Sequence, residues 1–176
     1  MRRFYSFFRI SLLVLLLSDL GPHAQAGVFS TFESAVESTA AFHDACSKEQ
    51  TIHALFALEG GADPYFTSDE ITQPGILRAF EKEMFTVVAA ILEKTKNEHS
   101  VSPRIGVVLT ALIEAISKKD NFAHTCGWRE MYSNHCQYKK LIRMIFDVEI
   151  GHDFKNYLSI AFRNGSPLLV ELLFER

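Results

Sequence analysis

Two places in this sequence gather the side chains with the greatest capacity for chemistry. At the first, His43, Asp44 and Cys46 fall within one short predicted helix, where the imidazole and the thiol could be drawn as the base and nucleophile of Cys/His catalysis. Cys46 occupies an apolar position of that helix, so we expect a reduced, inert thiol in the core. The second place carries four residues of the types that ligate zinc: His124, Cys126, His135 and Cys136.

No recognised catalytic motif accompanies these residues. The sequence lacks a Gly-rich phosphate loop after a strand, a Gly-x-Ser-x-Gly elbow and a His-Glu-x-x-His pair. The basic pairs at 118–119 and 139–140 are too small for a nucleic-acid footprint. We therefore expect a protein that is not an enzyme and that uses no cofactor, no metal and no nucleic acid.

The first 26 residues have the features of a secretory signal peptide. Arginines flank a short apolar core, and the small-residue triplet that ends at Ala26 provides a cleavage site. The uncharged run is much shorter than the roughly 20 residues that span a bilayer. We predict a signal peptide at 1–26, a mature domain at 27–176 that is not held in the membrane, and a periplasmic or secreted location.

Cleavage would leave an acidic domain. It removes three Arg and one Asp from the 18 basic and 21 acidic side chains, which leaves 15 and 20 and a formal charge of −5. An acidic surface disfavours binding to a phosphate backbone and suits a basic partner.

An exported chain is exposed to oxidising conditions, which bears on the second Cys and His group. Cys126 and Cys136 lie ten residues apart in a segment that we expect to be irregular, and this favours a disulfide between them. Closing such a loop stabilises a fold by about 2 to 3 kcal/mol. Zinc is the alternative, but His-x-Cys and His-Cys are not recognised zinc spacings.

The elements that position these residues are clearest at the end of the chain, where 156–176 reads as helix, turn, helix. Leu158, Ala161 and Phe162 place an apolar stripe on the first helix. Gly165 supplies the conformation that ends it. A second apolar helix follows, and a pair this small needs neighbours of the same shape to bury its faces.

Upstream segments repeat this pattern. When Ala45, Ala79 and Ala115 are aligned with Ala161, apolar residues recur three positions before the alanine and nine, twelve and thirteen after it, with an acid at fourteen. In the third copy the second helix comes late, which indicates an insertion. We predict an all-α solenoid of about four helical hairpins behind a capping helix at 27–39. The repeats lie near 40–71, 72–107, 108–153 and 154–176, with the insertion at 120–138.

The stretch 58–64, Leu-Glu-Gly-Gly-Ala-Asp-Pro, resembles the end of the second helix and the Gly-Ala-Asp loop of an ankyrin repeat. Residues 158–165 likewise resemble an ankyrin first helix and its Gly turn. The chain is therefore identified as a degenerate ankyrin-repeat protein over 42–176, and this resemblance implies binding of a protein through a concave face and its loops.

The sequence departs from the ankyrin pattern at several positions. Glu49, Glu83 and Lys119 stand where the Gly between the two helices is expected, and only His43 keeps the usual His of the first helix. Unrelated helical hairpins are the alternative, and the all-α class holds for both.

Two segments outside the template are candidates for partner recognition, because loops on a rigid scaffold commonly carry it. One follows Asp63, and the other is the insertion, which holds the only Trp of the chain. Packing of their aromatic side chains in the core is the alternative at both places. The residues that we expect to contact the partner are Tyr65, Phe66, Asp69, Glu70, Arg78, Glu81, Trp128, Arg129 and Tyr132.

These observations predict a monomeric, exported protein-binding scaffold. Two kinds of scaffold fit: an immunity protein that neutralises a basic toxin, and a secreted effector that binds a host protein. The alternatives are a periplasmic structural or stress-related factor without one tight partner, and an enzyme whose site the sequence hides.

Overall fold

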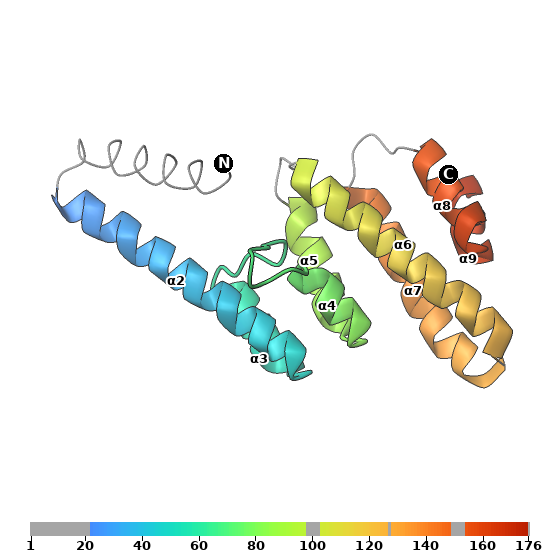
Figure 1. Cartoon of the computed structure of the whole chain (residues 1–176), viewed down its shortest axis with the longest axis horizontal. Coiled ribbons are helices and arrows are strands. Elements are labelled where there is room, and N and C mark those ends of the chain that lie inside the picture. The colour runs from blue at the N-terminus through green and yellow to red at the C-terminus, as the bar shows by residue number, and fades with distance from the viewer. Residues whose placement is uncertain (1–21, 98–102, 127, 149–153, 176) are drawn as a thin grey trace.

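The computed structural model describes residues 22–97, 103–126, 128–148 and 154–175, with side chains over 34–97, 103–121, 135–148 and 154–175. This part of the chain contains eight α-helices and no strand, which confirms the predicted all-α class (Figure 1). The helices are α2 (Pro22–Ser47), α3 (Thr51–Glu59), α4 (Gly75–Glu81), α5 (Phe85–Asn97), α6 (Pro103–Cys126), α7 (Trp128–Val148), α8 (Phe154–Asn164) and α9 (Pro167–Phe174).

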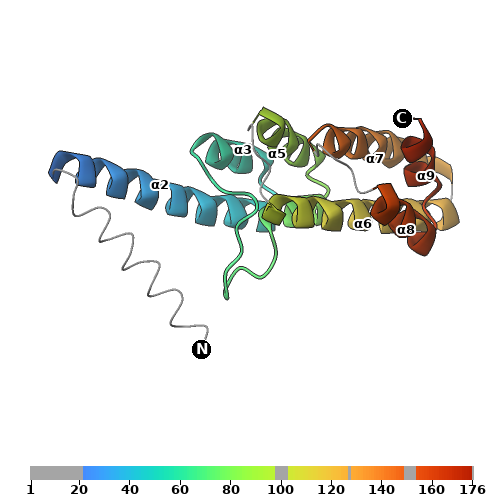
Figure 2. The same cartoon turned by 90° about the horizontal axis from the view of Figure 1, so that it is seen from above.

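The helices form four consecutive pairs that stack in chain order. The first helices of the pairs, α2, α4, α6 and α8, contact one another in sequence, and so do the second helices, α3, α5, α7 and α9. Figure 2 shows the second helices as one layer lying over the first. Apolar side chains between successive pairs form one continuous core, so each pair is covered by its neighbours.

Three of the four pairs share one turn geometry. Glu49, Glu83 and Gly165 all have positive φ, at 59°, 56° and 64°. In each turn the following residue donates its backbone N–H to the carbonyl of the repeated alanine, over 2.9, 2.9 and 3.0 Å. This bond and the left-handed residue satisfy carbonyl groups at the end of the first helix. Glutamate therefore takes the glycine conformation at two of the turns.

The third pair differs from its prediction. The segment 120–138, expected to be an irregular insertion, is helical at every described residue: α6 runs to Cys126 and α7 begins at Trp128. The sequence holds no Pro between Pro103 and Pro167, so no residue in this segment blocks helix formation. The long hairpin is an extension of both helices of the repeat.

At the other end, α2 runs without a break from Pro22 through the predicted capping helix into the first helix of the first pair. The helix is therefore continuous near residue 40, where the first repeat is predicted to begin. Most of the predicted signal peptide, residues 1–21, lies outside the described residues. None of the described helices is both long and apolar enough to cross a membrane.

The repeated alanines differ in how deeply they are buried. Ala45, Ala79 and Ala161 are buried, as the alignment predicts. Ala115 is only half-buried at the edge of the core, so the third pair packs less closely at this position.

Candidate binding surface at the loop after α3

The loop between α3 and α4 begins at Gly61, whose φ of 93° redirects the chain away from α3. Its residues 62–74 are called the finger below. Asp63 accepts the N–H of Tyr65 on Oδ1 over 2.9 Å, and its own N–H donates to Thr39 Oγ1 over 2.9 Å. Ile76 donates its N–H to the carbonyl of Pro64 over 3.1 Å. The base of the finger is thus fixed to the helices on both sides.

Tyr65 anchors the finger, and its predicted role as a partner contact is wrong. The side chain is only 5% exposed, and its hydroxyl lies 2.6 Å from Thr95 Oγ1 on α5. A buried tyrosine needs a partner for its hydroxyl, and Thr95 provides one inside the core. Tyr65 therefore belongs to the packing between the finger and the second pair.

The tip of the finger remains on the surface, as predicted. The Phe66 side chain is exposed, and so are Asp69 and Glu70. A tight turn holds the tip, with the N–H of Ser68 donating to the carbonyl of Ile71 over 2.8 Å. The tip thus presents one aromatic ring and two acidic side chains on an ordered loop.

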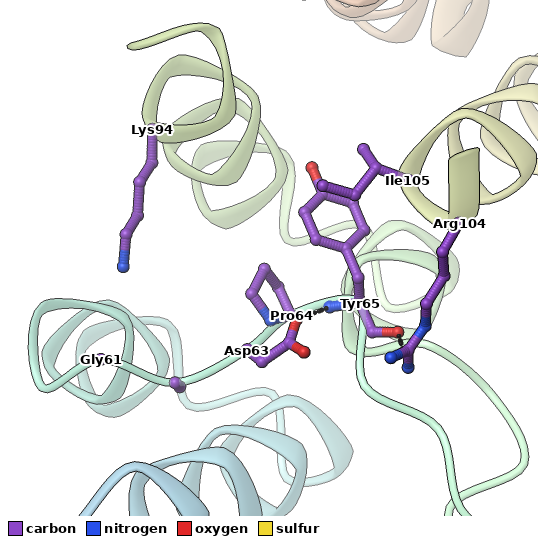
Figure 3. A pocket seen from close by; sticks show the side chains of 8 residues that line it. Gly61, Asp63, Pro64, Tyr65, Lys94, Arg104 and Ile105 are labelled. Atoms are coloured by element: carbon purple, nitrogen blue, oxygen red, sulfur yellow. Dashed lines mark hydrogen bonds between the residues drawn. The ribbon is translucent and has the colours of Figure 1, made fainter. Parts of the chain in front are cut away.

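A pocket of about 340 Å³ lies beside the finger, between α5 and α6 (Figure 3). Its walls are Gly61, Ala62, Asp63, Pro64, Tyr65, Lys94, Arg104 and Ile105.

Two cations from different helices border this pocket. Lys94 on α5 donates to the carbonyl of Leu58 over 3.0 Å. Arg104 on α6 donates from one nitrogen to the carbonyl of Tyr65 over 2.6 Å and to Thr67 Oγ1 over 3.3 Å. Figure 3 shows Lys94 near the Gly61 end of the loop at 61–65 and Arg104 near its Tyr65 end. An ammonium has three donors and a guanidinium five, so both keep N–H groups for acceptor oxygens of a ligand.

Arg104 also connects the pocket to the finger tip. Its guanidinium carbon lies 6.0 Å from the centroid of the Phe66 ring, within the range of a cation–π contact. The pocket and the exposed ring are therefore parts of one surface, which we call the finger surface: Phe66, Asp69, Glu70, Lys94 and Arg104.

Arg78 and Glu81, also predicted to contact a partner, lie on α4. Arg78 is half-buried and donates to Ser47 Oγ over 2.9 Å, so it packs α4 against α2. Glu81 is exposed. Neither residue lines the pocket.

The predicted partner contacts in the insertion lie on α7, which contributes no residue to the finger surface. The side chains of Trp128, Arg129 and Tyr132 lie outside the described residues, although their backbone is part of α7. Cys136 has a free, exposed thiol, so the disulfide predicted between it and Cys126 is not formed in this structure. The side chain of Cys126 lies outside the described residues. The described side chains include no cluster of three metal-ligating groups, and His124 is not among them.

The first Cys and His group lies in the core. Burial, together with the charge of Arg78, holds the pKa of His43 below its ordinary value, although Asp63 opposes the shift. Burial raises the pKa of Cys46 to about 11, which disfavours the reactive thiolate. Neither ring nitrogen of His43 has a hydrogen-bond partner. The side chains of His43 and Cys46 are therefore part of the packed core.

Lys94 and Arg104 were missed by the sequence reasoning, although one of them leaves a signal. Arg104 directly follows Pro103 in the first turn of α6, where the helix dipole disfavours a cation. A basic residue in that position therefore indicates a contact outside the helix. Lys94 lies in the last turn of α5, which is a favourable place for a cation and gives no such signal.

Comparison with known proteins adds no relative: no family model, no curated protein and no solved structure matches this chain.

Proposed function

We propose that the protein is a non-catalytic binding scaffold, an ankyrin-like solenoid of helical hairpins that recognises a segment of another protein at the finger surface. The ankyrin-like organisation is supported by the two stacked layers of helices and by the turn that recurs at Glu49, Glu83 and Gly165. The repeated alanines of the first two pairs, Ala45 and Ala79, are 34 residues apart, which fits the period of an ankyrin repeat.

The observation that carries the proposal is the pocket between Lys94 and Arg104 beside the exposed ring of Phe66. Carboxylate or carbonyl oxygens of a partner segment would accept the remaining N–H groups of the two cations. An apolar side chain of the same segment would cover Phe66. The acidic tip at Asp69 and Glu70 would meet a basic residue next to that segment.

Selection of peptides from a random displayed library, with the immobilised full chain as bait, tests this proposal. We expect selected peptides that carry Asp or Glu next to an apolar residue. Their affinity should fall by at least tenfold for Lys94→Ala and for Phe66→Ala, because both side chains would lie in the contact. Lys155→Ala, which removes an exposed cation on α8, is the matched control and should leave the affinity unchanged.

Peptides that bind all three variants equally would place the site elsewhere. Failure to select any peptide, with a folded bait, would also count against recognition of a linear segment at the finger surface.

A further inference from the structure

The imidazole of His43 lies where α2 meets the base of the finger and the start of α4. Its side chain is only 4% exposed, and neither ring nitrogen has a hydrogen-bond partner among the described residues. A buried polar group that makes no hydrogen bond destabilises the folded state, because water would bond the same group in an open state. This ring is therefore a weak point in the packing of the first pair of helices.

The end of the finger that leads into α4 packs directly on this ring. A Cβ atom at Gly75, the first residue of α4, would lie 2.4 Å from Cε1 of Phe42 and 3.3 Å from Cε1 of His43. Only a residue without a side chain fits so close a contact. The Phe42 ring also packs edge-on against the imidazole, with the ring centroids 5.9 Å apart.

The other end of the finger is attached to α2 four residues before His43. Thr39 Oγ1 accepts the N–H of Asp63 over 2.9 Å and donates to the carbonyl of Ala35 over 2.8 Å. Residues four apart lie on the same face of a helix, so Thr39 and His43 hold both ends of the finger. We call these two contacts, Thr39 with Asp63 and His43 with Gly75, the α2–finger contact.

A positive charge on the imidazole would face the guanidinium of Arg78 on α4. Arg78 is fixed there, because it donates to Ser47 Oγ over 2.9 Å and Ser47 donates its hydroxyl to the carbonyl of His43 over 2.8 Å. Burial lowers the pKa of His43 most, Arg78 lowers it further, and Asp63 of the finger raises it. The net effect is to disfavour the protonated ring while the contact is closed.

Other titratable groups on the elements around the ring do not change this balance. His53 and Glu59 of α3 are exposed, and Asp44 of α2 is exposed and pairs with Lys48 over 2.8 Å. The Cys46 thiol stays neutral, because burial raises its pKa to about 11. The charges that act on the ring are those of Arg78 and Asp63.

We infer that the α2–finger contact is an acid-sensitive switch: protonation of His43 opens it and separates the base of the finger from α2. Opening would give water to both ring nitrogens and would move the new charge away from Arg78. The finger would stay attached to the second pair, because the hydroxyl of Tyr65 lies 2.6 Å from Thr95 Oγ1. The inference goes beyond the proposed function and does not depend on it, since the opening can be measured without a partner.

Amide hydrogen exchange of the full chain, followed by NMR spectroscopy at pH 7.5 and 5.5, tests the switch. The protection factor, which is corrected for the intrinsic exchange rate at each pH, measures the opening equilibrium. We expect the protection factor of the Asp63 amide to fall by about tenfold, the factor for a group that titrates near 6.5 only in the open state. Leu112, in the middle of α6, should keep a higher protection factor at both pH values.

Substitutions of two histidines in the first pair assign the effect. His43→Leu removes the buried titratable group, so the protection factor of Asp63 should become the same at both pH values. His53→Leu is the matched control, the same change at an exposed histidine, and it should keep the tenfold fall. His43→Gln also stays neutral at both pH values and replaces the leucine variant if that variant does not fold.

A parent chain with the same Asp63 protection factor at both pH values would overturn the inference. So would a fall that persists in a folded His43 variant, because another group would then cause it. Equal protection factors for Asp63 and Leu112 at pH 5.5 would also contradict the inference, because acid would then unfold the chain as a whole instead of opening this contact.

Discussion

The short hairpin of α4 and α5 and the long hairpin of α6 and α7 have the same register, yet they turn at different places. In the short hairpin the chain reverses at Glu83, four residues after the repeated alanine. At the equivalent Lys119, α6 continues as a helix. Neither residue is a glycine, so the residue type at this position does not determine where the hairpin turns.

The next residue in each hairpin shows a clearer difference. Met84 is apolar and buried in the turn of the short hairpin. The equivalent Asp120 in the long hairpin is 1% exposed and accepts the Ser166 hydroxyl over 2.8 Å and the Leu168 N–H over 3.4 Å on Oδ2. These bonds tie the middle of α6 to the start of α9, and His135 Nδ1 lies 3.5 Å from the other carboxylate oxygen. Contacts with the following pair thus keep α6 helical beyond the usual turn.

Substitution of the repeated alanines should give the largest difference in the free energy of unfolding between variants of the two hairpins. Ala79→Arg would place an unpaired charge in a fully buried position and should lower the free energy of unfolding by more than about 4 kcal/mol. Ala115→Arg can extend its charged end to solvent from a half-buried position, so we expect a loss below about 1.5 kcal/mol. Urea unfolding followed by circular dichroism measures both, and equal losses would show that the two layers pack alike.

The polar contact of the long hairpin should have the next largest effect. Asp120→Ala would leave Ser166 without its acceptor in a buried place, and we expect the free energy of unfolding to fall by about 2 to 3 kcal/mol. Lys118→Ala, which removes an exposed ion pair to Glu114 on the same helix, should cost about 0.5 kcal/mol or less. If the two variants unfold at the same urea concentration, Asp120 does not hold α6 and α9 together.

The buried His43 of the first pair contrasts with Asp120, because its ring nitrogens have no partner. Its folded pKa is lowered from 6.5, chiefly by burial, so below pH 6.5 the unfolded chain takes up a proton that the folded chain does not. The free energy of unfolding should therefore decrease as the pH is lowered below 6.5, by up to about 1.4 kcal/mol per pH unit for this one group. His43→Leu should remove this part of the pH dependence in urea titrations at pH 5 to 7. A slope that stays the same in the variant would assign the effect to other groups.

Much of the repeated framework could be predicted from the sequence. The apolar spacing around Ala45, Ala79 and Ala161 identifies three helix pairs, because burial between neighbours constrains each position to small or apolar residues. The turn geometry at Glu49 and Glu83 could not be read from composition. A positive φ at glutamate is set by the packing of the flanking helices, which overrides the local preference.

The candidate site was only partly predictable. Phe66, Asp69 and Glu70 follow from an exposed loop between two helices, but Tyr65 does not, since a ring with a hydroxyl suits both a partner surface and a core with a polar acceptor. Lys94 bonds the carbonyl of Leu58 on α3, and Arg104 bonds the carbonyl of Tyr65 in the finger, across 36 and 39 residues of sequence. The positions of these two cations depend on how the helix pairs stack, and they leave little pattern in the local sequence.

Glycine substitution at the two equivalent positions most directly tests whether one register gives two different turns. Glu83→Gly should raise the free energy of unfolding by about 0.5 to 1 kcal/mol, since glycine adopts positive φ without strain and only an exposed ion pair with Lys119 is lost. Lys119→Gly should lower it by about 1 kcal/mol, because glycine weakens the interior of a helix. The prediction is a change of opposite sign in paired urea titrations. Changes of the same sign at the two positions would contradict it.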